Sequence, residues 1–264
     1  MEGDVCSFFK RHSSPEAAAR EARHLADLRG PGIVPLQRRR DGGELVLEKA
    51  ACSLADVLAE RGPLAEGEVR AVGAAAAAAL ARVHDAGGVH GDVKPANLLL
   101  SHAGELWLAD FDAACPADGK PLERHSPGRL PPGSPARAAT DVTALALALV
   151  ELATGSLLDP GTAWRTADLR RLGCSAGLSA ELSFMLGDAD SVPSARGAAD
   201  MFERGGNGPL PDPAVNAQRV DPTPTVEFMP ARPRPRSGSA QPESTAAEPS
   251  LRWWQRLAAS WRPR

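Results

Sequence analysis

Residues 90–97 read HGDVKPAN, residues 98–100 read LLL and, thirteen residues after Asn97, residues 110–112 read DFD. The apolar segments at 97–100 and 105–108 have the composition of short strands, so the charged residues lie next to predicted strands. An isolated Asp or Asn that follows a glycine is most often a turn residue. Whether these side chains carry chemistry therefore depends on the pattern as a whole.

The two stretches together resemble the catalytic loop and the magnesium-binding motif of the eukaryotic-type, bacterial-like serine/threonine protein kinases. In that family, catalysis consists mainly of positioning the reactants and stabilising charge. By this resemblance, Asp92 would accept the hydrogen bond of the substrate hydroxyl, and Lys94 would neutralise charge on the transferred phosphoryl group. Asn97 and Asp110 would bind Mg²⁺ through oxygen atoms. Five matched positions with a strand on either side favour this interpretation over unrelated turns.

Two charged residues upstream extend the resemblance. Lys10 ends a short apolar segment, and Glu21 lies in a predicted helix of residues 15–28. Taken alone, either would more commonly be a solvated surface residue. Their order ahead of the catalytic loop resembles the family's ion pair, in which the glutamate holds the lysine on the α- and β-phosphates of ATP. The resemblance thus assigns both residues to the nucleotide site.

Residues 45–50 read LVLEKA and fit the strand and hinge that bind adenine in the family. Backbone groups of Glu48 and Ala50 would bond the edge of the base, and Leu47 would stand behind it. Backbone contacts impose little on side chains, so an ordinary edge strand explains this segment nearly as well.

Downstream, residues 126–132 resemble the segment that closes the activation loop and receives the substrate. Asp141 resembles the acid that supports the catalytic loop from a buried helix. Ser126, in a chain that contains no tyrosine, favours serine/threonine over tyrosine phosphorylation. The resemblance covers residues 5–202.

The chain also departs from the family pattern. The two strands and Gly-rich loop that normally precede the lysine strand are missing, so either the true start lies upstream or half of the phosphate clamp is absent. Phe8 stands where a small residue usually faces adenine, and its ring would fill part of the nucleotide volume. Asp112 replaces a glycine, which is expected to affect switching more than chemistry.

Two further replacements concern arginine contacts. Gly91 replaces the arginine that usually reads activation-loop phosphate, so phosphorylation of that loop is not expected to be the main on-switch. Gly133 replaces the glutamate expected after residues 131–132, and its usual partner, for which Arg196 is the candidate, should be solvated or paired elsewhere.

The order of predicted elements indicates an α+β, two-lobed, protein-kinase-like fold with a truncated N-terminal β lobe and a mainly helical C-terminal lobe. Strands are predicted at 5–10, 33–37 and 44–47, and helices at 53–60, 66–84 and 141–153. The kinase-like domain would occupy residues 1–204. Residues 205–250 are rich in Pro, Gly and Ser and predict a disordered linker.

The remaining residues, 251–264, predict a short basic amphipathic helix with three tryptophans. Its pattern suits a reversible peripheral contact with an anionic membrane surface. Packing of the same apolar stripe on the kinase-like domain or on a partner is an equally good interpretation.

Composition limits the other classes of function. The formal net charge is −3 and the pI is about 6.1, so no nucleic-acid partner is expected. The four cysteines are far apart and lack zinc spacing, which fits a reduced cytoplasm. No apolar run is long enough to span a bilayer.

The leading hypothesis is a cytoplasmic serine/threonine kinase that transfers the γ-phosphoryl group of Mg-ATP to a protein Ser or Thr hydroxyl. The alternative is a pseudokinase that acts as a docking or allosteric module, which the missing Gly-rich loop and Phe8 favour. A small-molecule kinase is a weaker possibility, because the loops of such enzymes usually lack the Lys94-Pro95 pair.

Overall fold

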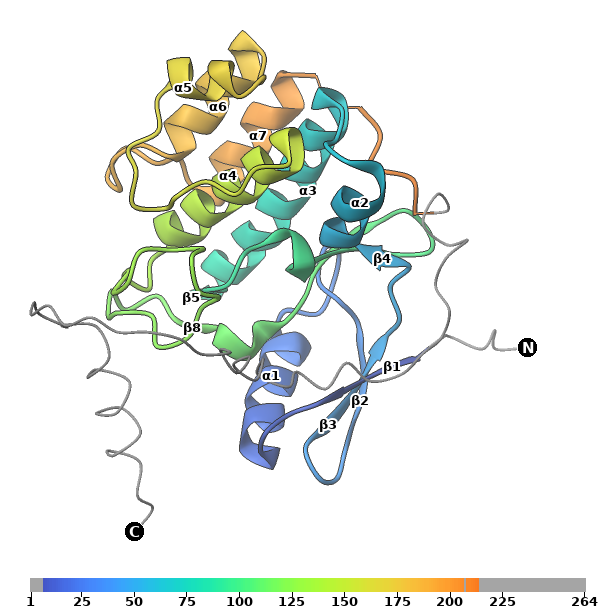
Figure 1. The fold of residues 1–264 in the computed structure, drawn as a ribbon. Helices are drawn as coiled ribbons and strands as arrows, with labels where there is room; N and C mark the ends of the chain where they lie inside the picture. Colours follow the sequence, from blue (N-terminus) through green and yellow to red (C-terminus); the bar gives the residue numbers. More distant parts are fainter. Residues whose placement is uncertain (1–6, 207, 214–264) are drawn as a thin grey trace, which may run out of the picture. The chain divides into compact units, whose positions relative to one another are not determined.

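The computed structural model describes residues 7–206 and 208–213, and its first part is a small antiparallel sheet beside one helix (Figure 1). The sheet has the order β1-β3-β2 and contains β1 (Ser7–Arg11), β2 (Leu36–Arg40) and β3 (Glu44–Glu48). Phe8 lies opposite Leu47 and Lys10 opposite Leu45. This register places Phe8 and Lys10 on one face of β1.

Helix α1 (Pro15–Asp27) begins at a well-formed cap. The Ser14 side chain accepts a hydrogen bond from the Ala17 backbone N–H, and Pro15 occupies the first turn, where its missing N–H costs nothing. The buried face of α1 carries Ala17, Ala18 and Leu25, and Glu21 lies on the same face with no exposed surface. A buried carboxylate needs partners, so α1 delivers Glu21 to a polar site.

The larger part of the described chain is mainly helical, with short strands and 3₁₀ turns that carry the predicted catalytic segments. Its elements are β4 (Cys52–Ser53), α2 (Leu54–Arg61), α3 (Glu66–Asp85), β5 (Gly88–Val89), η1 (Pro95–Asn97), β6 (Leu98–Leu100), β7 (Leu106–Leu108), η2 (Phe111–Ala113), β8 (Cys115–Pro116), α4 (Ala138–Thr154), α5 (Thr166–Arg171), α6 (Ala176–Met185) and α7 (Ala195–Arg204). The expected α+β class, with a small strand-rich part and a larger helical part, is confirmed.

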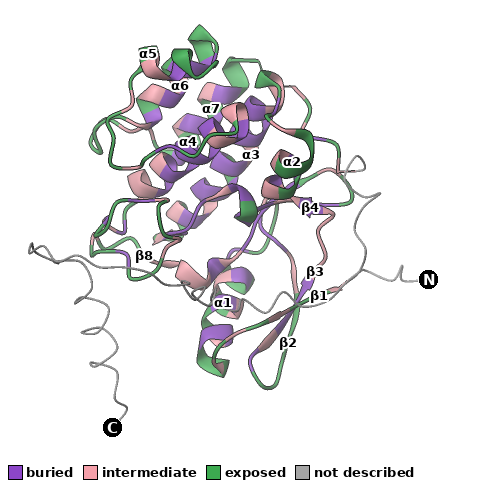
Figure 2. Cartoon of the chain, in the orientation of Figure 1, coloured by how far each residue is buried: buried purple, intermediate pink, exposed green. Residues whose placement is uncertain are grey.

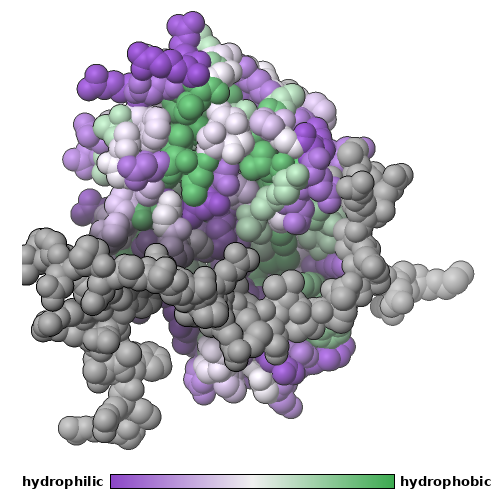
Figure 3. Space-filling model, viewed as in Figure 1, coloured by the Kyte–Doolittle hydropathy of each residue, from purple (hydrophilic) through white to green (hydrophobic). Residues whose placement is uncertain are grey.

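The core of the helical part lies where α3 and α4 pack side by side with α7, and buried residues follow these helices in Figure 2. Helix α3 carries a run of buried alanines, and α4 carries buried leucines and valines. Small residues on α3 let neighbouring helices approach closely. In the face shown in Figure 3, hydrophilic residues dominate the end of the molecule that carries α5.

Gly73 on α3 lies against Phe202 on α7. A Cβ atom at Gly73 would lie 2.7 Å from two ring carbons of Phe202, which is completely buried. We expect Gly73→Ala to lower the free energy of unfolding by about 1–2 kcal/mol, because overpacking outweighs the gain in helix propensity. Urea denaturation would measure the change. Phe202→Leu in the same background should recover part of the loss, and an unchanged midpoint for Gly73→Ala would contradict this packing.

The bounds of one predicted strand are wrong, although a strand is present. Residues 33–37 were expected to form a strand, but β2 begins only at Leu36, and Ile33 makes a single bridge to Leu108 of β7. The Val34 backbone N–H donates to the Leu108 carbonyl oxygen, and the Leu108 N–H donates to the Gly32 carbonyl oxygen. Pro35 follows directly and has no N–H to donate. Residues 32–34 therefore tie the helical part to the first sheet.

The packed part of the chain extends past the predicted boundary at residue 204. Helix α7 ends at Arg204, but the Gly208 backbone N–H donates to the Gly67 carbonyl oxygen on α3, and Leu210 packs against the core. The rest of the predicted linker and the predicted amphipathic helix at 251–264 lie outside the described residues. Among those described, no helix combines the length and apolar character needed to cross a bilayer.

Candidate active site

The loop between β5 and β6 is anchored by the buried carboxylate of Asp141. Asp141, near the start of α4, accepts the backbone N–H groups of His90 at 2.7 Å and Gly91 at 2.8 Å. The His84 Nε2 atom lies 2.9 Å from the same carboxylate. The His90 ring packs edge-on against Phe111 and contacts the Ala109 carbonyl oxygen through Nε2. These contacts fix the backbone that presents the next residue, Asp92.

Gly91 has φ +79, a conformation that favours glycine, and a Cβ atom there would lie 3.1 Å from the Ala113 carbonyl oxygen. Gly91, at the position where the resemblance expects an arginine, therefore has a backbone conformation that a larger side chain would strain. Arg196 pairs with Asp85 at 2.7 Å, and both side chains are largely exposed. Arg196 is therefore solvated and paired elsewhere, as expected where Gly133 replaces its usual glutamate partner.

Asp92 and Lys94 meet at the open side of this loop. The Lys94 Nζ atom lies 2.6 Å from Asp92 Oδ2, and it also donates to the Ser126 hydroxyl. The Ser126 hydroxyl donates to Asp92 Oδ2 at 3.0 Å, while its backbone N–H donates to Asp92 Oδ1 at 2.7 Å. A carboxylate, an ammonium group and an alcohol thus converge at one point.

The charge of Asp92 is stabilised in place. Burial, the largest influence, favours the neutral acid, but the hydrogen bonds from Lys94 and the Ser126 backbone outweigh it and lower the pKa of Asp92 below its usual value. A lowered pKa adds stability above pH ~4, and that stability is lost as the pH falls through the folded-state pKa. The carboxylate is therefore ionised throughout the neutral range.

Asn97 and Asp110 provide the oxygen atoms expected for a magnesium ion. The Asn97 Nδ2 atom donates to the Asp92 carbonyl oxygen at 2.8 Å, which orients the amide and leaves Oδ1 as its acceptor atom. Both residues line the same cavity. Mg²⁺ commonly uses one or two protein oxygen ligands and completes its shell with phosphate and water, so this donor set fits the ion.

Asp110 has an unusual backbone conformation. It is the one non-glycine residue of the described chain with a positive φ, at φ 65 and ψ 70. Such a conformation costs about 1–3 kcal/mol and persists only where neighbours enforce it. Here Asp110 Oδ1 contacts Lys10 Nζ at 2.7 Å, and the Phe111 backbone N–H donates to Glu21 Oε1 at 3.0 Å.

Lys10 and Glu21 form the predicted ion pair. Lys10 Nζ lies 2.8 Å and 2.7 Å from the two carboxylate oxygens of Glu21 and also contacts Asp110. Burial disfavours the charged amine, but the attraction of Glu21 and Asp110 is larger in sum and raises the pKa of Lys10. For Asp110, burial likewise opposes ionisation, yet the nearby Lys10 lowers its pKa. The positive charge of Lys10 thus faces the cavity at neutral pH.

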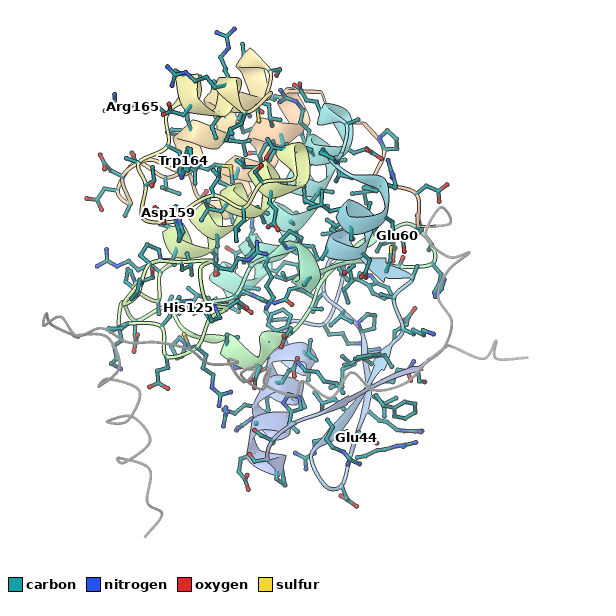
Figure 4. The ribbon with its side chains drawn as sticks, in the orientation of Figure 1. Glu44, Glu60, His125, Asp159, Trp164 and Arg165 are labelled. Carbon is teal, nitrogen blue, oxygen red and sulfur yellow. The ribbon has the colours of Figure 1, made fainter. Side chains whose placement is uncertain are left out.

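A cavity of about 660 Å³ lies between the first sheet and the helical part. Leu47, Glu48 and Ala50, the predicted adenine-binding residues, line it together with Phe8. Phe8 is 51% exposed, so its ring is open to the cavity and to solvent. The side-chain view in Figure 4 shows Glu60, which also lines the cavity, on α2.

A second, smaller cavity of about 270 Å³ lies beside Asp92 and Ser126. Its walls include Asp92, Asp110 and Asp112, and Ser126 with its neighbour His125, whose place in the loop before α4 is visible in Figure 4. Both cavities share Asp110. The arrangement can accommodate a phosphate-bearing ligand on one side and an alcohol on the other.

Two contacts of the site were not predicted from the sequence. The His12 side chain is buried against Glu21, and Ser126 lies on Asp92 and Lys94. His12 stands two residues after Lys10, just past the end of β1, and this spacing of two was the available signal. The contacts of Ser126 join residues 34 positions apart and have no local signal.

Comparison with known proteins gives consistent matches. The family described as the protein kinase domain matches residues 8–160. Serine/threonine-protein kinase F of Synechocystis is 38% identical over 107 residues, which cover 36% of this chain and 22% of that protein. Serine/threonine-protein kinase PknL of Mycobacterium tuberculosis is 41% identical over 95 residues, covering 34% and 24%.

A third relative, a probable serine/threonine-protein kinase of Corynebacterium efficiens, is 31% identical over 160 residues, covering 53% of this chain and 24% of that protein. The chain therefore spans about a quarter or less of the length of these curated relatives.

Proposed function

The chain belongs to the protein kinase family, and from this premise we propose that it is a serine/threonine protein kinase that transfers the γ-phosphoryl group of Mg-ATP to a protein Ser or Thr hydroxyl. The observation that carries the proposal is the convergence of Asp92, Lys94 and the Ser126 hydroxyl. An alcohol already lies within hydrogen-bond distance of the carboxylate that would orient the acceptor.

The roles follow from the positions of the charges. Asp92 would accept the hydrogen bond of the incoming hydroxyl and take up its proton. Lys94, 2.6 Å from Asp92, would offset the negative charge that develops during transfer. Lys10, fixed by Glu21, would face the phosphates, and the oxygens of Asn97 and Asp110 would hold Mg²⁺. The metal would neutralise phosphate charge when bound.

The adenine contacts in this proposal are made mainly by backbone groups. Leu47 would lie behind the base, and the backbone at Glu48 and Ala50 would bond its edge. The support is that all three line the larger cavity. Ser126 supports serine or threonine as the acceptor, since its hydroxyl lies within hydrogen-bond distance of Asp92 and Lys94.

The experiment is transfer of labelled phosphate from Mg-ATP to a generic protein acceptor such as casein, followed by identification of the labelled residue. Label on serine or threonine, dependent on Mg²⁺, is expected. A parallel reaction with small alcohols as acceptors tests the small-molecule alternative. Label on the alcohol and none on protein would contradict the proposal.

The pseudokinase alternative is favoured by one observation: Phe8 lines the cavity in which adenine would bind. We expect the Kd for Mg-ATP to lie above the micromolar range. Phe8→Ala should lower this Kd about threefold or more by freeing volume in the cavity, a change in binding free energy of roughly 0.7 kcal/mol. Calorimetry with and without Mg²⁺ measures both. Submicromolar binding by the parent would contradict the expected weak affinity. Weaker binding by Phe8→Ala than by the parent would show that the ring helps to hold the nucleotide.

The finer points of partners and location also remain proposals. A protein substrate is implied by the family. Cytoplasmic location and a peripheral contact through residues 251–264, with a membrane or with a partner, rest on composition and sequence pattern alone.

A further inference from the structure

His12 lies between two carboxylates from different parts of the fold. Its side chain is 4% exposed, and Nε2 lies 2.7 Å from Glu21 Oε2. On the other side of the ring, Nδ1 lies 3.7 Å from Asp112 Oδ1. The described residues give this Nε2 atom no hydrogen bond, so the ring lies close to the Glu21 carboxylate without an aligned donor. Glu21 is therefore faced by two basic side chains, Lys10 and His12.

Asp112 continues this series of contacts into the segment that precedes α4. Its second oxygen, Oδ2, accepts a hydrogen bond from Arg124 Nη1 at 2.8 Å. Arg124 is two residues before Ser126, which lies on Asp92. A series of neighbouring acidic and basic side chains thus runs from Glu21 on α1 through His12 and Asp112 to Arg124.

Acidic and basic side chains alternate along this series. Glu21 and Asp112 are both carboxylates, and a ring nitrogen faces each of them. The buried inner contact is screened little by solvent, whereas the outer pair of Asp112 and Arg124 is partly exposed and is expected to be weak.

We propose that His12 and Asp112 are positioning residues that couple the Lys10–Glu21 pair to the segment carrying Ser126. The proposal rests on the proposed kinase function for its effect on catalysis, but the coupling itself is a property of the fold. Asp112 then has a role of its own: it anchors the start of the segment through His12. Phe111, its neighbour, is held to the same Glu21 by a backbone hydrogen bond.

The test uses the full chain with His12→Phe, Asp112→Asn and the double variant. His12→Phe keeps an aromatic ring without nitrogen atoms, and Asp112→Asn keeps shape without charge. Asp118→Asn is the matched control, because Asp118 lies in the same segment and pairs with exposed Lys120. Hydrogen–deuterium exchange of residues 111–126 is measured without nucleotide, so that the readout does not depend on activity.

Each single variant should raise the exchange rate of residues 111–126 about threefold or more. The exchange rate in the double variant should be close to that in either single variant, because both changes break one coupled unit. The exchange rate of α4 should match the parent in every variant, and the exchange rate of residues 111–126 in Asp118→Asn should also match the parent. His12→Gln, which retains one donor, should restore part of the protection. If His12→Phe fails to fold, Asp112→Asn alone decides. Parental exchange in Asp112→Asn, or additive effects of the two changes, would overturn the proposal.

The kinetic readout separates this proposal from the proposed function. In an active parent, each variant should lower kcat about tenfold while KM for ATP changes less than twofold, because the alignment of Lys10 and Ser126 matters in the transition state. If the parent transfers no phosphate, the kinase proposal fails, and the exchange data still decide whether His12 and Asp112 couple the two parts.

Discussion

Asp92→Asn is expected to lower kcat for phosphate transfer by a factor of about 10²–10⁴, the range that general-base catalysis usually contributes. The amide keeps the shape of the carboxylate and can still accept the Ser126 backbone N–H. It cannot take up the proton of the acceptor hydroxyl, and it loses the charge that holds Lys94. Initial-rate kinetics with Mg-ATP and a protein acceptor measure the loss.

Nucleotide affinity should hardly change in the same variant. Asp92 lines the acceptor-side cavity and is absent from the walls of the larger cavity. Asp85→Asn, a charge loss at an exposed residue, serves as the control and should keep parental rates. An Asp92→Asn variant with parental kcat would falsify the assignment of Asp92 as the catalytic acid–base residue.

Asp110→Asn is expected to damage both binding and transfer. Its carboxylate contacts Lys10, and it lies with Asn97 on the wall of the nucleotide cavity. Removing its charge should abolish the difference between ATP affinities with and without Mg²⁺, since the remaining amide is a poorer ligand for a hard cation. We expect kcat/KM to fall about a thousandfold, about 4 kcal/mol of transition-state stabilisation.

Calorimetry with ATP at zero and saturating Mg²⁺ tests this second prediction. The Glu21 contact with Lys10 remains in the variant, so metal-free binding should be retained. A variant whose affinity still rises with Mg²⁺ as in the parent would show that the metal is held elsewhere.

The parts of the site that the sequence predicted were those specified by short spacings. Asp92, Lys94 and Asn97 lie within six residues, and the structure brings them together because one loop is pinned by Asp141. The Lys10–Glu21 pair depends on a strand followed by a capped helix, and both elements had clear local signals. Their roles in catalysis and binding remain predictions.

The parts that could not be predicted depend on long-range contacts. Asp112 looked like the loss of a flexible glycine, and only the fold shows that His12, 100 residues earlier in the chain, faces it. Residues 33–37 had the composition of a strand, but Val34 bonds to Leu108 of β7 instead. Two-residue strands such as β5 and β8 exist because tertiary packing brings their backbones together, and so short a segment has no periodicity to read.

The most direct test of the central claim is transfer of labelled phosphate from ATP to a protein acceptor by the full chain, run with Mg²⁺, with a chelator, and with Asp92→Asn. We predict phosphoserine or phosphothreonine that requires Mg²⁺ and is lost in the variant. Absence of transfer by the parent under conditions where calorimetry shows bound Mg-ATP would contradict the account and leave the chain as a nucleotide-binding pseudokinase.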